Sequence, residues 1–245
     1  MSQHYFEKLI DQAAERIQSI TAEAVVAVDE LSKEALAGYI DHTLLKPEAT
    51  SDDIITLCEE AKQYTFASVC VHPSWVMNCL ELLEGSPVIM CSVVGFPLGS
   101  NTSETKALEA EELVSLGVKE IDMVLNVGRL KEKDYTFVFE DIQQVVDTAG
   151  GADVKVILET CLLNEREKIA GCVLSKEAGA HFVKTSTGFS KAGATVQDIQ
   201  LMRRVVGPEM GVKAAGGIRD YNTAIAMLRA GATRIGASAS VDIVS

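Results

Sequence analysis

The chain has 245 residues, 47% of them hydrophobic and 23% charged, a globular composition that excludes a disordered or coiled-coil protein. Its 35 acidic and 22 basic residues give a formal net charge of −13, which argues against partners such as nucleic acid or an anionic membrane. Because no apolar run approaches the ~18 residues of a membrane span and the charged N-terminus lacks a signal-peptide core, we expect a cytoplasmic protein.

Residues 1–37 are predicted to form an N-terminal helical extension, with helices over Tyr5–Ile20 and Thr21–Ala37. Residues 38–245 then alternate short β-rich runs with amphipathic helical stretches and form the second predicted unit. The eight predicted strands, in chain order, are Tyr39–Leu45, Ala67–His72, Val88–Phe96, Glu120–Val127, Val154–Thr160, Phe182–Thr187, Val212–Ile218 and Arg234–Ser240.

Helix boundary signals separate these strands. Thr50–Asp53 and Thr195–Asp198 resemble capping boxes, and Gly117, Gly179 and Gly231 stand where a left-handed residue closes a helix before the next strand. Eight β/α units without a linker predict an α/β protein with a single (β/α)8 TIM barrel and a short or missing eighth helix. The extension is then expected to cover the N-terminal end of the barrel, with a contact between subunits as the alternative.

An open doubly wound sheet is the competing fold, and the facing of side chains discriminates between the two. Strand residues alternate between two faces, and in an open sheet both faces pack against helices and read as continuous hydrophobic runs. Here charged residues share the face opposite the apolar one, which favours the lumen of a closed barrel. These residues are Asp122, Lys155, Glu159, Lys184 and Lys213.

Buried charges in a lumen indicate chemistry more than stability, because replacing a buried ion pair by apolar residues is often neutral or stabilising. Two ammonium groups close together disfavour each other's charged state, and desolvation adds to this effect. The pKa of such a lysine falls from ~10.4 towards ~7. A neutral amine attacks a carbonyl to form a Schiff base, whose iminium allows a carbon–carbon bond to break or form. Asp122 is the expected proton donor and acceptor.

A phosphate site is predicted in the last third of the chain. Gly216-Gly217-Ile218-Arg219 follows the seventh strand, and glycine and serine alternate with alanine over 236–240 in the eighth. Backbone N–H groups at such glycines approach an anion closely, and phosphate sites after strands seven and eight recur in this fold. Thr187–Ser190, after the sixth strand, is expected to add donors.

At these positions the sequence resembles the deoxyribose-phosphate aldolases, which are Schiff-base (class I) enzymes. The resemblance runs in order, one segment for each strand, from about residue 38 onward. The matching segments are IDHTLLKP (40–47), FASVCVHP (66–73), CSVVGFPLG (91–99), EIDMVLNVG (120–128), KVILET (155–160), FVKTSTGF (182–189), VKAAGGIR (212–219) and RIGASAS (234–240).

The resemblance implies reversible cleavage of 2-deoxy-D-ribose 5-phosphate to D-glyceraldehyde 3-phosphate and acetaldehyde, in deoxyribonucleoside catabolism and without a cofactor. It makes Lys184 the Schiff-base nucleophile, Lys213 the residue that perturbs it and joins the proton relay, and Asp122 the acid/base group. The expected ligands are a small phosphorylated sugar and acetaldehyde. The expected assembly is a homodimer or a homotetramer, and the sequence does not decide between the two. The expected substrate-binding residues are Gly188, Gly217, Ile218 and Ser238 for the phosphate, and Asp41, Thr43 and Lys155 as supports around the hydroxyls and Asp122.

Two departures from the family pattern bear on these expectations. The chain stops at Ser245 without the terminal tyrosine of some members, so proton transfer is expected to rely on water and Asp122. Ala239 stands where a second serine often follows Ser238, which removes one expected phosphate hydrogen bond.

Other functions stay open at this point. A transaldolase or a ketose-phosphate aldolase would use the same lysine chemistry, and a non-catalytic sugar-phosphate binder would keep the barrel. No metal site is expected, because the six cysteines are scattered and no CxxC or HExxH motif is present. Lys46 and Lys106 are expected to be solvated.

Overall fold

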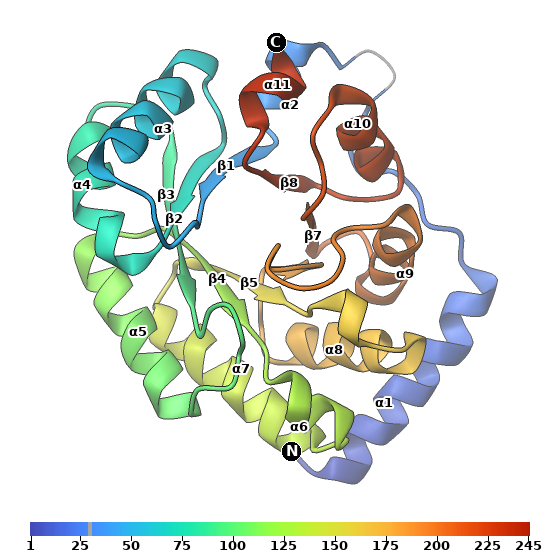
Figure 1. The fold of residues 1–245 in the computed structure, drawn as a ribbon. Coiled ribbons are helices and arrows are strands. Elements are labelled where there is room, and N and C mark those ends of the chain that lie inside the picture. The colour runs from blue at the N-terminus through green and yellow to red at the C-terminus, as the bar shows by residue number, and fades with distance from the viewer. Residues whose placement is uncertain (29–30) are drawn as a thin grey trace.

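The structure is a computed structural model that describes residues 1–28 and 31–245. Within them, eight strands close into a barrel in sequence order, all neighbours are parallel, and β8 pairs with β1. Helices surround this barrel (Figure 1). The predicted (β/α)8 barrel is therefore confirmed, and the open sheet is excluded. The strands are β1 (Ile40–Leu44), β2 (Ser68–Val71), β3 (Ile89–Val94), β4 (Glu120–Val124), β5 (Asp153–Ile157), β6 (Phe182–Lys184), β7 (Gly211–Ala215) and β8 (Arg234–Ala237).

The outer layer consists of α-helices and short 3₁₀ turns, and the helix after β8 has a single turn, as predicted. None of the described helices combines the length and the apolarity that crossing a bilayer requires. The helices are α1 (Gln3–Arg16), α2 (Lys33–Ala37), α3 (Ser51–Tyr64), α4 (Val76–Leu82), α5 (Ser103–Leu116), α6 (Val127–Lys131), α7 (Tyr135–Ala149), α8 (Glu165–Glu177), α9 (Val196–Val206), α10 (Tyr221–Arg229) and α11 (Ser240–Val244), and the 3₁₀ turns are η1 (Ile17–Ser19), η2 (Pro73–Trp75) and η3 (Thr160–Leu162).

Local signals in the sequence explain where several helices begin and end. Thr50 and Asp53 form a complete capping box at the start of α3, whereas Thr195 caps α9 by accepting a hydrogen bond from the Asp198 N–H. Gly117 ends α5 with a φ of 108°, a conformation that favours glycine.

The strands end earlier than the hydrophobic runs predicted. β4 stops at Val124, because the Asn126 side chain accepts a hydrogen bond from the Arg129 N–H and starts α6 at Val127. β5 stops at Ile157, two residues before Glu159 takes a left-handed conformation with a φ of 55°. The residues predicted as the ends of these two strands therefore form loops at the mouth of the barrel and the first residues of α6 and η3.

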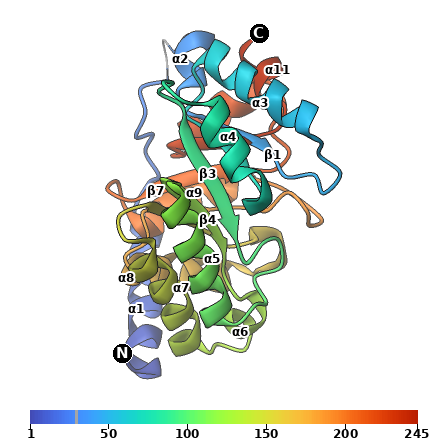
Figure 2. The ribbon, with the colours of Figure 1, turned by 90° about the vertical axis from the view of Figure 1, so that its left-hand side faces the viewer.

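The first helix of the N-terminal extension, α1, does not cover the end of the barrel. α1 packs against α7 and α8 on the outside of the helical layer (Figures 1 and 2). Its buried face carries Phe6, Ile10 and Ala13, and the Phe6 ring lies 4.9 Å from that of Phe139 on α7. The predicted lid is therefore wrong for α1, whose apolar stripe packs on other helices.

The predicted second helix, Thr21–Ala37, is wrong over residues 21–28, which form no helix; α2 covers only its last turn. Residues 29–30 of that prediction lie outside the described part of the chain. The segment contains three valines, which have reduced helix propensity. Val25 on it is 45% exposed, so its apolar residues do not form one buried stripe.

Lys106 is also placed differently from its prediction. Its side chain is buried between α5 and α7, and its Nζ lies 2.6 Å from Oδ2 of Asp141, which is equally buried. A buried ammonium requires such a partner, and the partner comes from a helix 35 residues away. Lys46, in contrast, is exposed as expected.

Candidate active site

Strand register brings the predicted lysines together in the lumen. Lys184 on β6 is the direct neighbour of Lys213 on β7, and Asp122 on β4 is the direct neighbour of Lys155 on β5. Paired residues of adjacent parallel strands point to the same side of the sheet. All four side chains are 3% exposed or less.

The carboxylate of Asp122 is the centre of this cluster. Its Oδ2 lies 2.7 Å from the Nζ of Lys184 and 2.6 Å from the Nζ of Lys213, and its Oδ1 lies 3.0 Å from the Nζ of Lys155. Four of the five charged residues that were expected to converge therefore do so. The fifth, Glu159, lies apart at the mouth, where it accepts a hydrogen bond from the Thr187 hydroxyl.

A second charged layer lies on the side of the lysines nearer the start of the strands. Asp41 places Oδ2 2.5 Å from the Nζ of Lys213 and Oδ1 2.7 Å from Nη1 of Arg234. Glu120 bonds Arg234 through both oxygens, at 3.1 Å each, and lies 2.7 Å from the Nζ of Lys155. Asp41 and Lys155 thus support the cluster beneath Asp122, and the Thr43 hydroxyl donates to the Asp41 backbone carbonyl.

Charge pairing outweighs burial at these groups. Burial acts to raise the pKa of Asp122, but Lys155, Lys184 and Lys213 together hold it well below its usual range. Burial likewise acts to lower the pKa of Lys213, but Asp122 and Asp41 raise it above its ordinary value. Mutual repulsion between the two lysines therefore does not neutralise Lys213, which stays a cation at neutral pH.

The contacts of the lysines differ. Lys213 contacts two carboxylates and Lys155 contacts three, whereas Lys184 contacts only Asp122 within the described residues. Since that carboxylate is shared with two other ammonium groups, deprotonation of Lys184 leaves every carboxylate of the cluster with a cation. Of the three lysines, Lys184 is therefore the one on which the ion pairs of the described cluster depend least.

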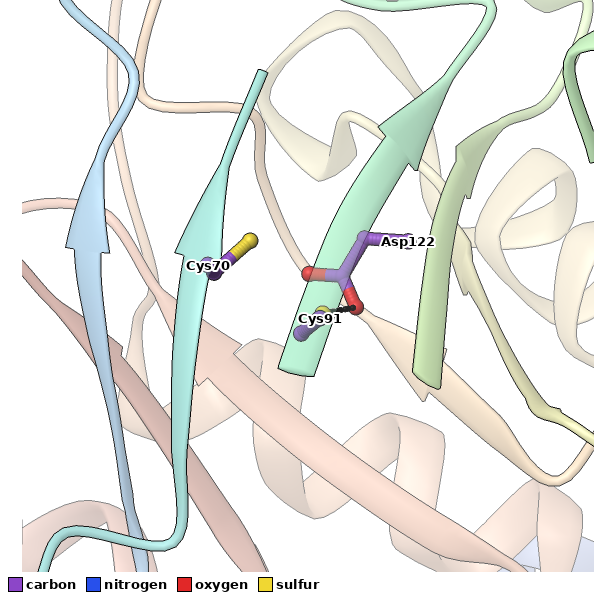
Figure 3. A group of neighbouring side chains, drawn as sticks. All are labelled: Cys70, Cys91 and Asp122. Carbon is purple, nitrogen blue, oxygen red and sulfur yellow. Dashed lines mark hydrogen bonds between the residues drawn. The ribbon is translucent and has the colours of Figure 1, made fainter. Parts of the chain in front are cut away.

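Two thiols complete the lumen beside Asp122 (Figure 3). Cys91 Sγ lies 3.5 Å from Oδ1 of Asp122 and 3.4 Å from the Nζ of Lys155, and Cys70 is the direct neighbour of Cys91 on β2. These three residues have metal-ligand atoms within 4.8 Å of one another. They do not suit a divalent ion, because it would lie against the ammonium groups that already occupy both oxygens of Asp122.

A cavity of about 350 Å³ opens above the lysines at the carboxyl ends of the strands, a volume that suits a small ligand. Lys184 and Thr43 lie at its wall, whereas Asp122, Lys213, Asp41 and Lys155 are not among its lining residues. The four residues predicted to hold the phosphate all line this same cavity: Gly188, Gly217, Ile218 and Ser238.

The loops around the cavity offer unused donors. Gly188 and Gly217 have φ values of 88° and 80°, which only glycine adopts readily. Within the described chain, the N–H groups of Gly188, Gly217 and Ser238 make no hydrogen bond. Lys46 and Arg219 also line the cavity and add positive charge, so this end of the cavity suits an anion.

Sequence reasoning missed Glu120 and Arg234 as parts of the site, although a signal was present. Glu120 has the same parity as Asp122 on its strand and therefore faces the lumen. Arg234 begins the segment RIGASAS, whose glycine and serines indicate a phosphate site but give no sign of the arginine's role. Arg219, similarly, belongs to the GGIR sequence but was assigned no contact.

Comparison with known proteins agrees with this geometry. Residues 35–244 match the family model described as DeoC/LacD family aldolase. The deoxyribose-phosphate aldolase of Streptococcus sanguinis is 58% identical over 206 residues, 84% of this chain and 94% of that protein. A solved Coccidioides immitis protein, provisionally named a deoxyribose-phosphate aldolase, superposes with a TM-score of 0.94 at 42% identity and covers 100% of this chain and 97% of its own. The deoxyribose phosphate aldolase of Aeropyrum pernix, described as having a unique tetrameric structure, gives a TM-score of 0.82 at 34% identity over 96% and 95% of the two chains.

Proposed function

Because the chain belongs to the DeoC/LacD aldolase family, we propose that it is a deoxyribose-phosphate aldolase. It cleaves 2-deoxy-D-ribose 5-phosphate reversibly to D-glyceraldehyde 3-phosphate and acetaldehyde, through a Schiff base on Lys184. One observation carries this proposal: among the described residues, Lys184 lines a cavity with N–H donors that make no hydrogen bond, and the one carboxylate that it contacts is shared with two other lysines.

The reaction follows from a neutral amine in that position. The Lys184 nitrogen adds to the aldehyde carbon of the open-chain sugar, and loss of water gives an iminium. The hydroxyl on the third carbon loses its proton, the bond between the second and third carbons breaks, and the electron pair moves to the iminium. Glyceraldehyde 3-phosphate leaves, the enamine is protonated, and hydrolysis of the iminium releases acetaldehyde.

Asp122 and Lys213 are the proposed proton relay. Both are fully buried, and Oδ2 of Asp122 joins the Nζ of Lys213 to that of Lys184 at 2.6 and 2.7 Å. A proton released at Lys184 therefore has a hydrogen-bonded acceptor, and a water molecule entering from the cavity would connect the relay to the substrate.

The test is chemical trapping. The protein is incubated with deoxyribose 5-phosphate and borohydride and then analysed by intact mass and peptide mapping. We expect a two-carbon adduct on Lys184, because reduction fixes the acetaldehyde imine. Reduction before cleavage fixes the imine of the intact sugar, so a five-carbon adduct on the same lysine is compatible with the proposal. A five-carbon adduct without any two-carbon adduct, or an unmodified chain, which would indicate a binding protein, contradicts it.

The phosphate is proposed to bind the loops of Gly188, Gly217, Ile218 and Ser238. A valine at position 217 should disturb this site, because a β-branched residue does not adopt a φ of 80°. For Gly217→Val we expect KM for deoxyribose 5-phosphate to rise by about tenfold or more, the loss of one or two hydrogen bonds to a charged group. The KM for unphosphorylated 2-deoxyribose should change much less.

Gly85→Val is the matched control, since Gly85 has a φ of 74°, has open space around it and lies outside the cavity lining. It introduces similar backbone strain and should leave both KM values unchanged. An equal rise for both substrates in Gly217→Val would contradict the phosphate assignment.

Three further proposals concern the whole protein. We propose that residues 38–245 form the catalytic domain and residues 1–37 an extension, since the cavity and the charged cluster lie entirely within the former. A homodimer or homotetramer is the proposed assembly, supported by the tetrameric description of the Aeropyrum pernix relative, and light scattering tests it. The cytoplasm is the proposed location of the protein, and fractionation of cells that produce it tests this.

A further inference from the structure

Arg234 occupies a position in the lumen that the reaction above does not use. Its guanidinium binds Asp41 at 2.7 Å and both oxygens of Glu120 at 3.1 Å, and the Phe182 ring lies 5.6 Å from it. The arginine side chain is only 15% exposed. Such a guanidinium, which remains charged at any working pH, is a fixed positive charge beneath the lysines.

Its two partners connect it to the lysines through two chains of contacts, which are also joined where the Nζ of Lys155 lies 3.8 Å from Oδ2 of Asp41. Glu120 forms an ion pair with Lys155, and Asp41 forms one with Lys213. Lys155 and Lys213 both bond Asp122, the carboxylate on which Lys184 depends. Arg234 and Glu120 have no contact with Lys184 in the described structure, so any effect on it passes through charge and through these contacts.

The cluster as a whole carries an excess positive charge. It contains four cationic and three anionic side chains: Lys155, Lys184, Lys213 and Arg234 against Asp41, Glu120 and Asp122. In a buried cluster an excess cation favours release of one proton, and Lys184 is the lysine with the fewest carboxylate contacts. The charge of the layer beneath therefore bears directly on its protonation.

We propose that Arg234 and Glu120 are positioning residues for the aldolase, which set the pH at which the Lys184 amine becomes nucleophilic by fixing the net charge of the lumen. The inference rests on the proposed function in one respect, because it takes the Lys184 amine to be the group that attacks the substrate. The other groups facing the cluster are the thiols of Cys70 and Cys91, and Lys46 and Arg219 lie at the cavity wall. All four are unchanged in the variants below.

The two residues carry opposite charges, so their neutral variants should act in opposite directions. Arg234→Leu removes the excess cation, which should move the midpoint of Lys184 reactivity upward by about one pH unit. Glu120→Gln removes an anion and should move it downward by a similar amount. The double variant restores the original net charge of the cluster and should return the midpoint close to that of the unaltered protein. Arg234→Lys keeps the charge and should leave it nearly in place.

The midpoint is measured by trace acetylation with acetic anhydride across a pH series, quantified on the Lys184 peptide by mass spectrometry. This readout requires no aldolase activity. The aldehyde-and-borohydride adduct, measured in parallel, reports the proposed function by itself. Arg166→Leu is the control for overall charge, because Arg166 is half-exposed and pairs with Asp11 on the surface; its midpoint should match the unaltered protein.

Opposite shifts that cancel in the double variant would establish the proposal. Shifts of the same sign, or none, in folded Arg234→Leu and Glu120→Gln would overturn it. If Arg234→Leu fails to fold, Glu120→Gln and the double variant still decide the question. If the midpoints shift as expected but no aldehyde adduct forms on Lys184, the proposed effect of the lumen charge is supported and the aldolase reaction is contradicted.

Discussion

Lys184→Leu should abolish the reaction. Without the amine no Schiff base forms, and we expect turnover of deoxyribose 5-phosphate to fall by roughly 10⁴-fold or more, as when other covalent nucleophiles are removed. The fold should persist, because Lys184 forms a single ion pair within the described part of the chain and Asp122 still pairs with the ammonium groups of Lys155 and Lys213. Steady-state kinetics, with circular dichroism to verify folding, measures both effects.

Lys213→Leu is the matched control, because it removes the same side chain from the neighbouring strand. The two-carbon adduct should still form on Lys184, but about 10²-fold more slowly near neutral pH. Lys213 stays charged in the folded protein, so its loss removes a cation and should move the rate profile towards higher pH. Near-normal turnover by Lys184→Leu would show that another residue is the nucleophile.

Asp122→Asn should damage both stability and turnover. One carboxylate oxygen becomes an amide NH₂ group, which would face either Lys155 or the pair Lys184 and Lys213 as a donor against donors. Leaving buried ammonium groups unpaired costs about 3–5 kcal/mol, so we expect the free energy of unfolding in urea to fall by that amount. Turnover should fall by about 10³-fold in the fraction that remains folded.

Asp141→Asn separates the two effects. Asp141 holds a fully buried lysine, Lys106, at 2.6 Å in the helical layer, so its loss should lower stability by a similar amount. It has no contact with the lumen cluster among the described residues, and the rate of the folded fraction should not change. If Asp122→Asn retained more than a tenth of the original turnover while folded, the acid/base assignment would be wrong.

The sequence by itself predicted the barrel and four of the charged residues in its lumen, which are Asp122, Lys155, Lys184 and Lys213. Alternating β-rich and amphipathic segments specify parallel strands with helical crossovers, and parity along Glu120–Val124 and Asp153–Ile157 assigns Asp122 and Lys155 to one face. Both periodicities are local properties of the chain. For the same reason Thr50 and Gly117 could be identified in advance as helix boundaries.

The tertiary structure sets which charged side chains contact one another and how many such contacts each of them makes. The surroundings of Lys106 depend on α7, the position of α1 depends on the outer faces of α7 and α8, and the second layer depends on Arg234 reaching Glu120 across 114 residues. Likewise, Lys184 and Lys213 differ not in residue type but in the carboxylates around them. Ion pairing is set by distances of a few ångströms between segments remote in the chain, and barrel closure, which no local pattern contains, fixes those distances.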